Sequence, residues 1–337
     1  MKMIDFTGCS AAQIDGLVNI CLPQPDECRI LLGDTFSAPN FLLTEISTGI
    51  GCLPTSDIHA EKGKQKSGKS NLNVIFLASL FGCQNFGFKS NIEDPKALYF
   101  DTEQAKINSQ MLLRKIHKLC GWSFEDAEKM QMFNLREIDM QKRFSFIAEK
   151  VMKENPDMVI IDGAVDLIAD FNDISESQQI IGKLMRLSSQ CDCAIINILH
   201  ENKSRDDKNM RGHLGTMLVQ KCSDCYEVVK SGAPERPTFN VEVSDCRNRP
   251  IEGFSFVLDD LGTPQPTISQ QDMKINSMRA KFAAAFGDND MLEKSTLTHR
   301  LEDTEGIKER GARYMIEKAI NNQIITLNNN GYLELKI

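Results

Sequence analysis

The stretch GKQKSGKS, residues 63–70, has the residue types and the spacing of a loop that binds phosphate groups. It satisfies the pattern G-x-x-x-x-G-K-[ST] through Gly63, Gly68, Lys69 and Ser70. The glycines can adopt positive φ and turn successive main-chain N–H groups inward around phosphate oxygens. Lys69 would place a charge between the β- and γ-phosphates, and the Ser70 hydroxyl could ligate Mg²⁺. The predicted phosphate-binding residues are Gly63, Lys64, Gln65, Lys66, Ser67, Gly68, Lys69, Ser70 and Asn71.

The context of this loop distinguishes a phosphate cradle from a solvated basic loop, which is the alternative. A strand is expected to end near Lys62, before the loop. After the loop, apolar residues recur with helical spacing at Val74, Ile75, Leu77, Ala78 and Phe81. Strand, loop and helix in this order would also place the phosphates at a helix N-terminus. The context therefore favours phosphate binding.

The segment PDMVIIDG supplies a candidate metal-holding acid. Its apolar run, Met158–Ile161, is typical of a buried strand in a parallel sheet, and the run ends in Asp162. Ligands of α/β proteins lie at the carboxyl ends of such strands. We expect Asp162 to hold Mg²⁺ through water, and the alternative is an acid that only ends a strand.

The segment ALYFDTEQ supplies a candidate general base. Ala97–Phe100 predicts a strand, Asp101–Gln104 a turn, and Ala105–Cys120 an amphipathic helix. Glu103 falls two residues beyond the strand, where a carboxylate could orient an attacking water. The alternative is that Glu103 is a first-turn acid that complements the helix dipole.

Composition limits the other classes of function. The 337 residues are 41% hydrophobic, so a sizeable core is available, and the net charge of −8 argues against a protein that coats nucleic acid non-specifically. No apolar run reaches the roughly 18 residues of a membrane span, and the N-terminal residues lack the apolar core of a signal peptide. We expect a cytoplasmic protein with reduced cysteines and no membrane partner.

Taken together, residues 63–70, FDTEQ at 100–104 and VIIDG at 159–163 resemble the RecA-type ATPase core. The resemblance extends over about residues 30–260 and implies ATP and Mg²⁺ as cofactors, with Lys69, Glu103 and Asp162 in catalysis. The predicted strand 193–199 is followed directly by His200, at the position where this group of ATPases has a polar residue that senses the γ-phosphate. The alternative for His200 is a hydrogen-bonded strand-end histidine without a function.

The segment after His200 resembles that of hexameric replicative helicases and of RepA-like plasmid ATPases. In that group the equivalent loop faces a central pore and contacts single-stranded DNA. The resemblance thus implies DNA contacts for Lys203, Arg205 and Arg211. Because the charges of this loop are mixed, a solvated segment without a ligand stays open.

The segment VSDCRNRPIEGFSFVLDD resembles the helicase hairpin whose basic pair reaches the nucleotide of the neighbouring subunit. Arg247 falls at the arginine-finger position, but Asp245 replaces the usual lysine two residues earlier. Arg249 is expected on the same side of a strand as Arg247 and could substitute. The resemblance implies a homo-oligomer, which in that group is a hexameric ring.

Alternating strand and helix patterns predict a mostly parallel sheet with helices on both faces, the RecA-like α/β core. Further helices are expected at Phe124–Met132, Met140–Glu154 and Glu176–Gln190. The predicted organisation is an N-terminal arm (1–30), a RecA-like ATPase domain (31–262), a proline-containing linker (263–269) and a C-terminal domain (270–337).

The C-terminal domain predicts three helices and a hairpin around an Asn-Gly turn, which resembles a winged helix. Ser295 or Thr296 is the expected N-cap of the second helix. The third helix would be the recognition element, with duplex DNA contacts from basic residues opposite an apolar face that includes Tyr314. These basic residues are Lys308, Arg310 and Arg313. A winged helix that contacts protein is the alternative.

The combination predicts an ATP-hydrolysing, DNA-associated protein of a plasmid or other mobile genetic element, acting in replication, mobilisation or transposition, with a helicase-like ring as its expected form. Two alternatives remain. One is a nucleotide-gated DNA-binding regulator without motor activity, which Asp245 favours. The other is a P-loop kinase of a small molecule, for which only the loop 201–210 could serve as a lid.

Overall fold

The computed structural model describes residues 29–336, apart from 36–38, 124, 126–127, 202–209, 211, 268–269, 288, 323 and 329–330, and for 270–277 it describes only the backbone. The chain divides into two compact units, Met1–Thr267 and Ile268–Ile337, and each is described by itself. Almost all of the predicted N-terminal arm, 1–30, lies outside the described residues.

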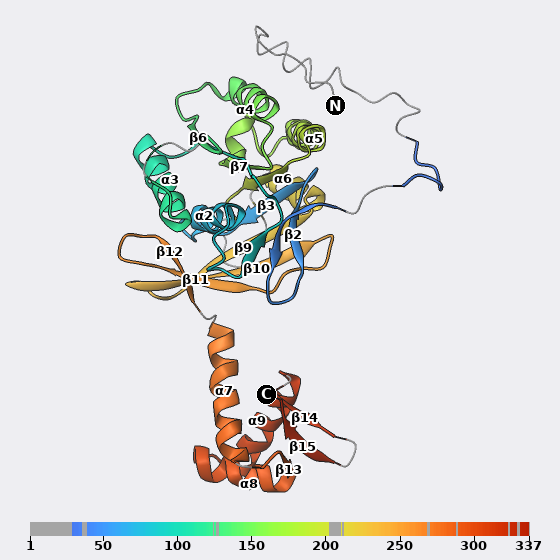
Figure 1. Cartoon of the computed structure of the whole chain (residues 1–337), viewed down its shortest axis with the longest axis vertical. Coiled ribbons are helices and arrows are strands. Elements are labelled where there is room, and N and C mark those ends of the chain that lie inside the picture. Colours follow the sequence, from blue (N-terminus) through green and yellow to red (C-terminus); the bar gives the residue numbers. More distant parts are fainter. Residues whose placement is uncertain are drawn as a thin grey trace. The chain divides into compact units, whose positions relative to one another are not determined.

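The first unit is built on a nine-stranded sheet of order β12-β11-β10-β9-β3-β8-β7-β5-β6 (Figure 1). Its parallel part comprises β3 (Ile58–Lys62), β5 (Ala97–Asp101), β6 (Met130–Asn134), β7 (Met158–Asp162), β8 (Ala194–Ile198) and β9 (Asp224–Ala233). The antiparallel strands β10 (Arg236–Cys246), β11 (Phe254–Leu258) and β12 (Pro264–Thr267) extend it beyond β9. Every residue of β5, β7 and β8 is buried, as expected of strands covered on both faces.

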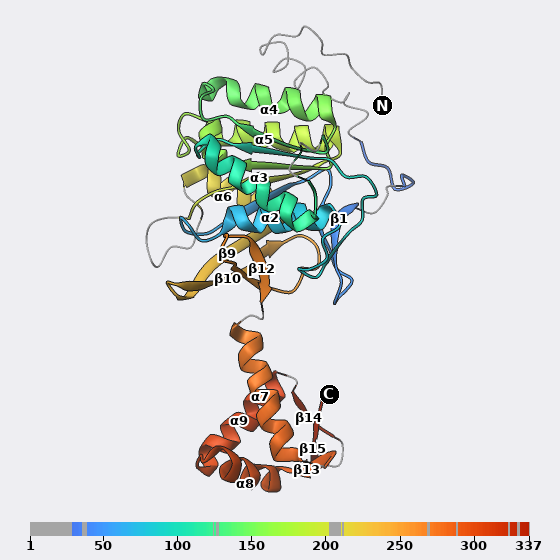
Figure 2. The same ribbon diagram turned by 60° about the vertical axis from the view of Figure 1, so that its left-hand side comes forward.

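Two hydrophobic cores hold helices against the two faces of this sheet (Figure 2). One face is covered by α2 (Lys69–Leu80) and α3 (Lys106–Cys120). The other is covered by α4 (Met140–Glu154), α5 (Ile174–Cys191) and α6 (Gly212–Lys221), with a short 3-10 helix at Ala164–Leu167. A small antiparallel sheet of β1 (Phe41–Glu45), β2 (Gly51–Pro54) and β4 (Phe88–Ser90) adds to the first core. The predicted α/β class, a mostly parallel sheet with helices on both faces, is confirmed.

Two predictions for this unit are wrong. The helix predicted at Phe124–Met132 is contradicted by β6, which starts at Met130 and pairs with β5 over its whole length. Sheet pairing far along the chain overrides the local helical spacing there. The linker predicted at 263–269 is also wrong in part, because Pro264–Thr267 form β12 on β11. Prolines are tolerated there because an edge strand needs hydrogen bonds on one side only.

The second unit contains the three predicted helices and the predicted hairpin. These are α7 (Gln270–Phe286), α8 (Lys294–Glu305) and α9 (Glu309–Asn321), with β14 (Ile325–Leu327) and β15 (Tyr332–Leu335). A three-residue strand that was not predicted, β13 (Met291–Glu293), completes a sheet of order β13-β15-β14. Because β13 continues directly into α8, the N-cap is Glu293 rather than Ser295 or Thr296. The assignment as a winged helix stays a prediction.

Apolar side chains from all three helices and the sheet form the core of the second unit. Its largest fully buried members are Phe282, Phe286, Leu297, Leu301, Ile316, Ile324, Ile325 and Leu333. None of the helices within the described residues has both the length and the apolar character needed to cross a membrane.

Candidate functional site

The loop between β3 and α2 has the backbone that the glycine pattern predicts. Gly63 and Gly68 have φ of 149° and 101°, and Gly68 is the N-cap of α2. A Cβ on Gly63 would lie 2.5 Å from the main-chain oxygen of Val228, and one on Gly68 would lie 2.5 Å from the Phe239 ring. Both positions therefore require glycine, for conformation and for space.

Lys69 points back over this loop. Its Nζ donates to the main-chain oxygens of Gly63, at 2.8 Å, and Lys64, at 3.0 Å, and lies 3.0 Å from Nδ1 of His200. Burial lowers the pKa of Lys69, and the neighbouring acids, among them Asp162 and Glu103, oppose that shift when they are ionised. The ammonium group is thus held at the start of α2, where the free main-chain N–H groups of the first helical turn also point.

The two predicted metal residues are in contact. The Ser70 hydroxyl donates to Oδ2 of Asp162 at 2.9 Å, and the Tyr99 hydroxyl donates to the same oxygen at 2.7 Å. Burial raises the pKa of Asp162, whereas the hydrogen bonds from Tyr99 and Ser70 act to lower it. A hydroxyl beside a carboxylate offers the oxygen ligands that Mg²⁺ prefers, so these residues fit a magnesium ion.

Asp101 shapes the turn that carries Glu103. Its Oδ1 accepts the main-chain N–H groups of Glu103, at 3.1 Å, and Gln104, at 2.9 Å, and its Oδ2 accepts from the Ser109 hydroxyl at 2.7 Å. The helix that follows, α3, starts only at Lys106 and has no acid in its first turn. The alternative that Glu103 is a first-turn acid of the helix is therefore wrong. Its side chain is available to the candidate site instead.

His200 connects the phosphate loop to Glu103. Because the Lys69 ammonium can only donate, Nδ1 of His200 accepts, and the ring proton is on Nε2. Nε2 lies 3.5 Å from Oε2 of Glu103, and the contact with His200 lowers the pKa of that carboxyl group. Residues after β3, β5 and β8 thus form one chain of polar contacts, Lys69–His200–Glu103.

Several residues of this site were not predicted. Tyr99 was interpreted only as an apolar strand residue, although its hydroxyl bonds Asp162. Gly163 has φ of 101°, and a Cβ on it would lie 2.1 Å from Oγ1 of Thr102 and 2.9 Å from Cγ of Glu103. The signal was present in the sequence, because this glycine directly follows Asp162. Because Gly163 has no side chain, the turn that carries Glu103 can lie close to Asp162.

The predicted arginine finger, Arg247, lies apart from this cluster. Arg247 donates to the main-chain oxygen of Lys221 at 2.7 Å and lies 3.9 Å from Asp57. Asp57 precedes β3, whereas the phosphate loop follows β3, so Arg247 is at the opposite end of that strand. Arg247 and Arg249 follow the last residue of β10, so the prediction that they share one side of a strand is wrong. The pairing of β10 with β9 ends at Cys246, before either arginine.

The predicted nucleic-acid residues are separated between the two units. Lys203, Arg205 and Arg211 lie outside the described residues. Lys308, Arg310 and Arg313 are exposed at α9, where Arg313 pairs with Glu309. Tyr314 is 64% exposed, contrary to the prediction that it joins the apolar face. The buried side chains of α9 are Ala312, Ile316 and Ala319.

A family model covers most of this site. Residues 47–206 match a family model described as an AAA domain, a span that includes the phosphate loop, Glu103, Asp162 and His200 but not Arg247. No curated protein matches the sequence. Among solved structures, a KaiC-like protein from the hyperthermophilic archaeon Pyrococcus horikoshii is similar at 14% identity, covering 64% of this chain and 92% of that chain, with a TM-score of 0.44. The family match supports a RecA-like P-loop ATPase domain with nucleotide-binding ATPase activity in the first unit.

Proposed function

We propose that this chain binds ATP with Mg²⁺, hydrolyses it, and acts on DNA as a protein of a plasmid or other mobile genetic element. The observation that carries the hydrolytic part is the contact chain Lys69–His200–Glu103 beside the Ser70–Asp162 pair. It brings an ammonium group, a carboxylate and a hydroxyl–carboxylate pair together at one edge of the sheet, which supports their roles in phosphate binding, base catalysis and metal binding.

Each of these side chains has a role in phosphoryl transfer to water. Lys69 and the first N–H groups of α2 would bind the β- and γ-phosphates. Ser70 and Asp162 would hold Mg²⁺, which neutralises charge on the phosphates when bound. Glu103 would orient the attacking water and accept its proton. His200, in contact with both ends of this chain, would position Glu103 relative to Lys69.

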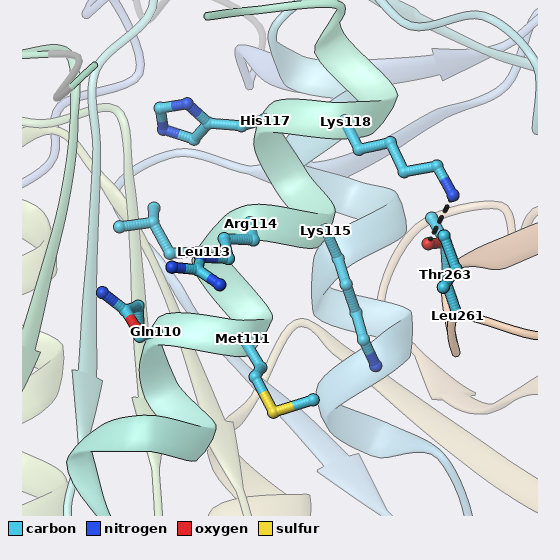
Figure 3. Close-up of a pocket in the computed structure, with 9 residues that line it drawn as sticks. All are labelled: Gln110, Met111, Leu113, Arg114, Lys115, His117, Lys118, Leu261 and Thr263. Atoms are coloured by element: carbon cyan, nitrogen blue, oxygen red, sulfur yellow. Dashed lines mark hydrogen bonds between the residues drawn. The ribbon is translucent and has the colours of Figure 1, made fainter. Parts of the chain in front are cut away.

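A cavity of about 640 Å³ beside α3 is the proposed site for the nucleoside (Figure 3). Lys115, which lines it, donates to Oδ1 of Asn71 at 3.0 Å, so the cavity adjoins the first turn of α2. Lys118, on the same side of α3 as Lys115, donates to the Thr263 hydroxyl at 3.1 Å (Figure 3). The apolar side chains of Met111 and Leu261 are 50% and 75% exposed there, and offer surfaces on which a base can pack.

Filling this cavity should weaken binding of the nucleoside without affecting phosphate binding. We expect M111W to raise the Kd for ATP about tenfold, equivalent to ~1.4 kcal/mol, and to leave the Kd for inorganic tripolyphosphate unchanged. Ile107 is on the same helix, is 59% exposed and does not line the cavity, so I107W is the matched control. Equal loss of ATP and tripolyphosphate affinity would place the base elsewhere. Calorimetric titration gives both constants.

The DNA part of the proposal is supported by the second unit. α9 exposes Arg310, Tyr314 and Lys318 at intervals of four residues, which lie on one side of a helix. Cations that alternate with an aromatic ring suit phosphate contacts and stacking. The acidic Glu309 and Glu317 on the same helix limit the number of phosphates that such a surface neutralises.

Phosphate release measured with and without DNA tests this part. We expect DNA to stimulate hydrolysis, and R310A/R313A to lose duplex affinity by about tenfold while basal hydrolysis is retained. The double variant E302Q/D303N on α8 is a control for altered surface charge. The proposal of DNA association is contradicted if neither single-stranded nor duplex DNA changes the rate or binds the wild type.

A nucleotide-gated regulator without motor activity is the second candidate. It is favoured by Arg247, whose guanidinium group contacts Lys221 and Asp57 of its own chain, and by Asp245 in place of a basic residue. Strand displacement by the purified oligomer would exclude this candidate. Sizing the protein with a non-hydrolysable ATP analogue would show whether nucleotide promotes the proposed homo-oligomer.

A further inference from the structure

A glutamate and an asparagine are paired beneath the phosphate loop and are not explained by the proposed catalytic roles. Glu61 is in β3 and Asn73 is in α2, and both are fully buried. Oε2 of Glu61 accepts a hydrogen bond from Nδ2 of Asn73 at 2.9 Å. Nδ2 also donates to the main-chain oxygen of Lys69 at 3.2 Å. The pair therefore connects the phosphate-loop strand to the first turn of the helix that follows.

The remaining oxygen atoms of this pair have no partner. Within the described residues, neither Oε1 of Glu61 nor Oδ1 of Asn73 has a hydrogen-bond partner, and both are buried. The ammonium group of Lys69 donates to main-chain oxygens and to His200, not to Glu61. An ionised carboxylate in this position would be a buried charge without an ion pair, which is costly. With Glu61 ionised, its Oε1 and Oδ1 of Asn73 can both only accept, so neither can satisfy the other.

One proton satisfies both oxygens. We propose that Glu61 is a neutral carboxylic acid whose O–H donates to Oδ1 of Asn73, so that acid and amide form a cyclic pair that positions Lys69 and the first turn of α2. Each of the four polar atoms then has a partner. A neutral Glu61 also does not compete with bound phosphates for the positive charge of Lys69, as a carboxylate anion would.

The surroundings of Glu61 favour the protonated form. Burial is the largest cause that raises the pKa of Glu61 well above its usual value, and Asp162 in β7 adds to the shift. Cys225 in β9 acts in the same direction, whereas Lys69 and the hydrogen bond from Asn73 oppose it. Because its pKa is raised in the folded state, the contribution of Glu61 to the stability of the fold is greatest at low pH and is lost as the pH rises through that pKa.

Infrared spectroscopy tests the protonation directly. The difference spectrum between wild type and E61Q at neutral pH should contain the carbonyl band of a protonated carboxyl group, present only in the wild type. The matched control is E45Q. Glu45 is also buried, but its two oxygens accept from the main-chain N–H of Glu252, so E45Q controls for the loss of a buried glutamate whose oxygens both have partners. A carboxylate band for Glu61 would overturn the proposal.

Stability and nucleotide affinity test the role in positioning. In E61Q an amide replaces the acid and can retain both hydrogen bonds, so its Tm should lack the fall expected for the wild type as the pH rises from the usual range of a glutamate through the raised pKa of Glu61. E61L should raise the Kd for nucleotide at least about tenfold, and E61Q should restore it to within about twofold of wild type. Equal damage by E61L and E61Q would overturn the cyclic pair.

The affinity measurement rests on the proposed nucleotide site, whereas the infrared band and the pH dependence of Tm do not. If the wild type bound no nucleotide, the proposed function would fail and the infrared experiment would still decide the state of Glu61. If nucleotide bound normally and the band were absent, only the inference about Glu61 and Asn73 would fail.

Discussion

K69A should abolish ATP hydrolysis and weaken nucleotide binding by at least about tenfold. Lys69 is 5% exposed, and its Nζ is held by the main-chain oxygens of the loop, so no other cation of the loop can replace it without a change of backbone. The other loop lysines, Lys64 and Lys66, are exposed. Removing the ammonium group leaves the charge of the phosphates opposed only by main-chain N–H groups and Mg²⁺.

Isothermal titration with a non-hydrolysable analogue and a phosphate-release assay measure the two effects of K69A. The matched control is K153A, which removes an exposed lysine from α4 on the opposite face of the sheet. Circular dichroism of both variants checks that the fold is retained. If K69A bound and hydrolysed ATP like the wild type, the loop would not be a nucleotide site and the proposed function would be lost.

E103Q should separate hydrolysis from binding. The amide cannot accept a proton, so we expect turnover to fall by about 10²–10⁴-fold while the Kd for nucleotide stays close to that of the wild type. Because the contact with His200 lowers the pKa of Glu103, the base should stay ionised as the pH falls to the usual range of a glutamate. Turnover of the wild type should not be limited by this group at neutral pH.

Single-turnover hydrolysis together with equilibrium binding gives both quantities for E103Q. E149Q, an exposed glutamate on α4, is the control for the loss of one negative charge. Undiminished turnover in E103Q would assign the base to another acid of the site. Asp166 in the 3-10 helix Ala164–Leu167 is one such group, because it accepts from the hydroxyl of Thr102, the residue before Glu103, at 2.9 Å.

The parts of the site that follow local patterns could be predicted from the sequence. The glycine spacing and the acid that ends VIID each depend on a few adjacent residues, and the structure brings Ser70 into contact with that acid, Asp162. The role of Tyr99 could not be predicted, because its partner, Asp162, comes from another strand. This hydrogen bond depends on which strands are neighbours, and no local pattern records that.

The errors in the fold have the same origin. β6 and β12 are strands only because β5 and β11 pair with them, and by themselves their residues favour a helix or a linker. Tyr314 was assigned to the apolar face by spacing alone, but the core of the second unit is filled by Ala312, Ile316 and Ala319. Helical spacing shows which residues lie along one side of a helix, but only the packing of the helix determines which of them are buried.

The two prolines of β12 restrict how copies of this chain can associate. Pro264 and Pro266 alternate along the outermost strand and have no N–H, so the outer edge of β12 offers no donors at these positions to a further strand. Open sheet edges otherwise invite chains to add to one another without limit. Addition of a further strand to β12 is therefore disfavoured, and an assembly that grows through sheet edges would use an edge strand other than β12.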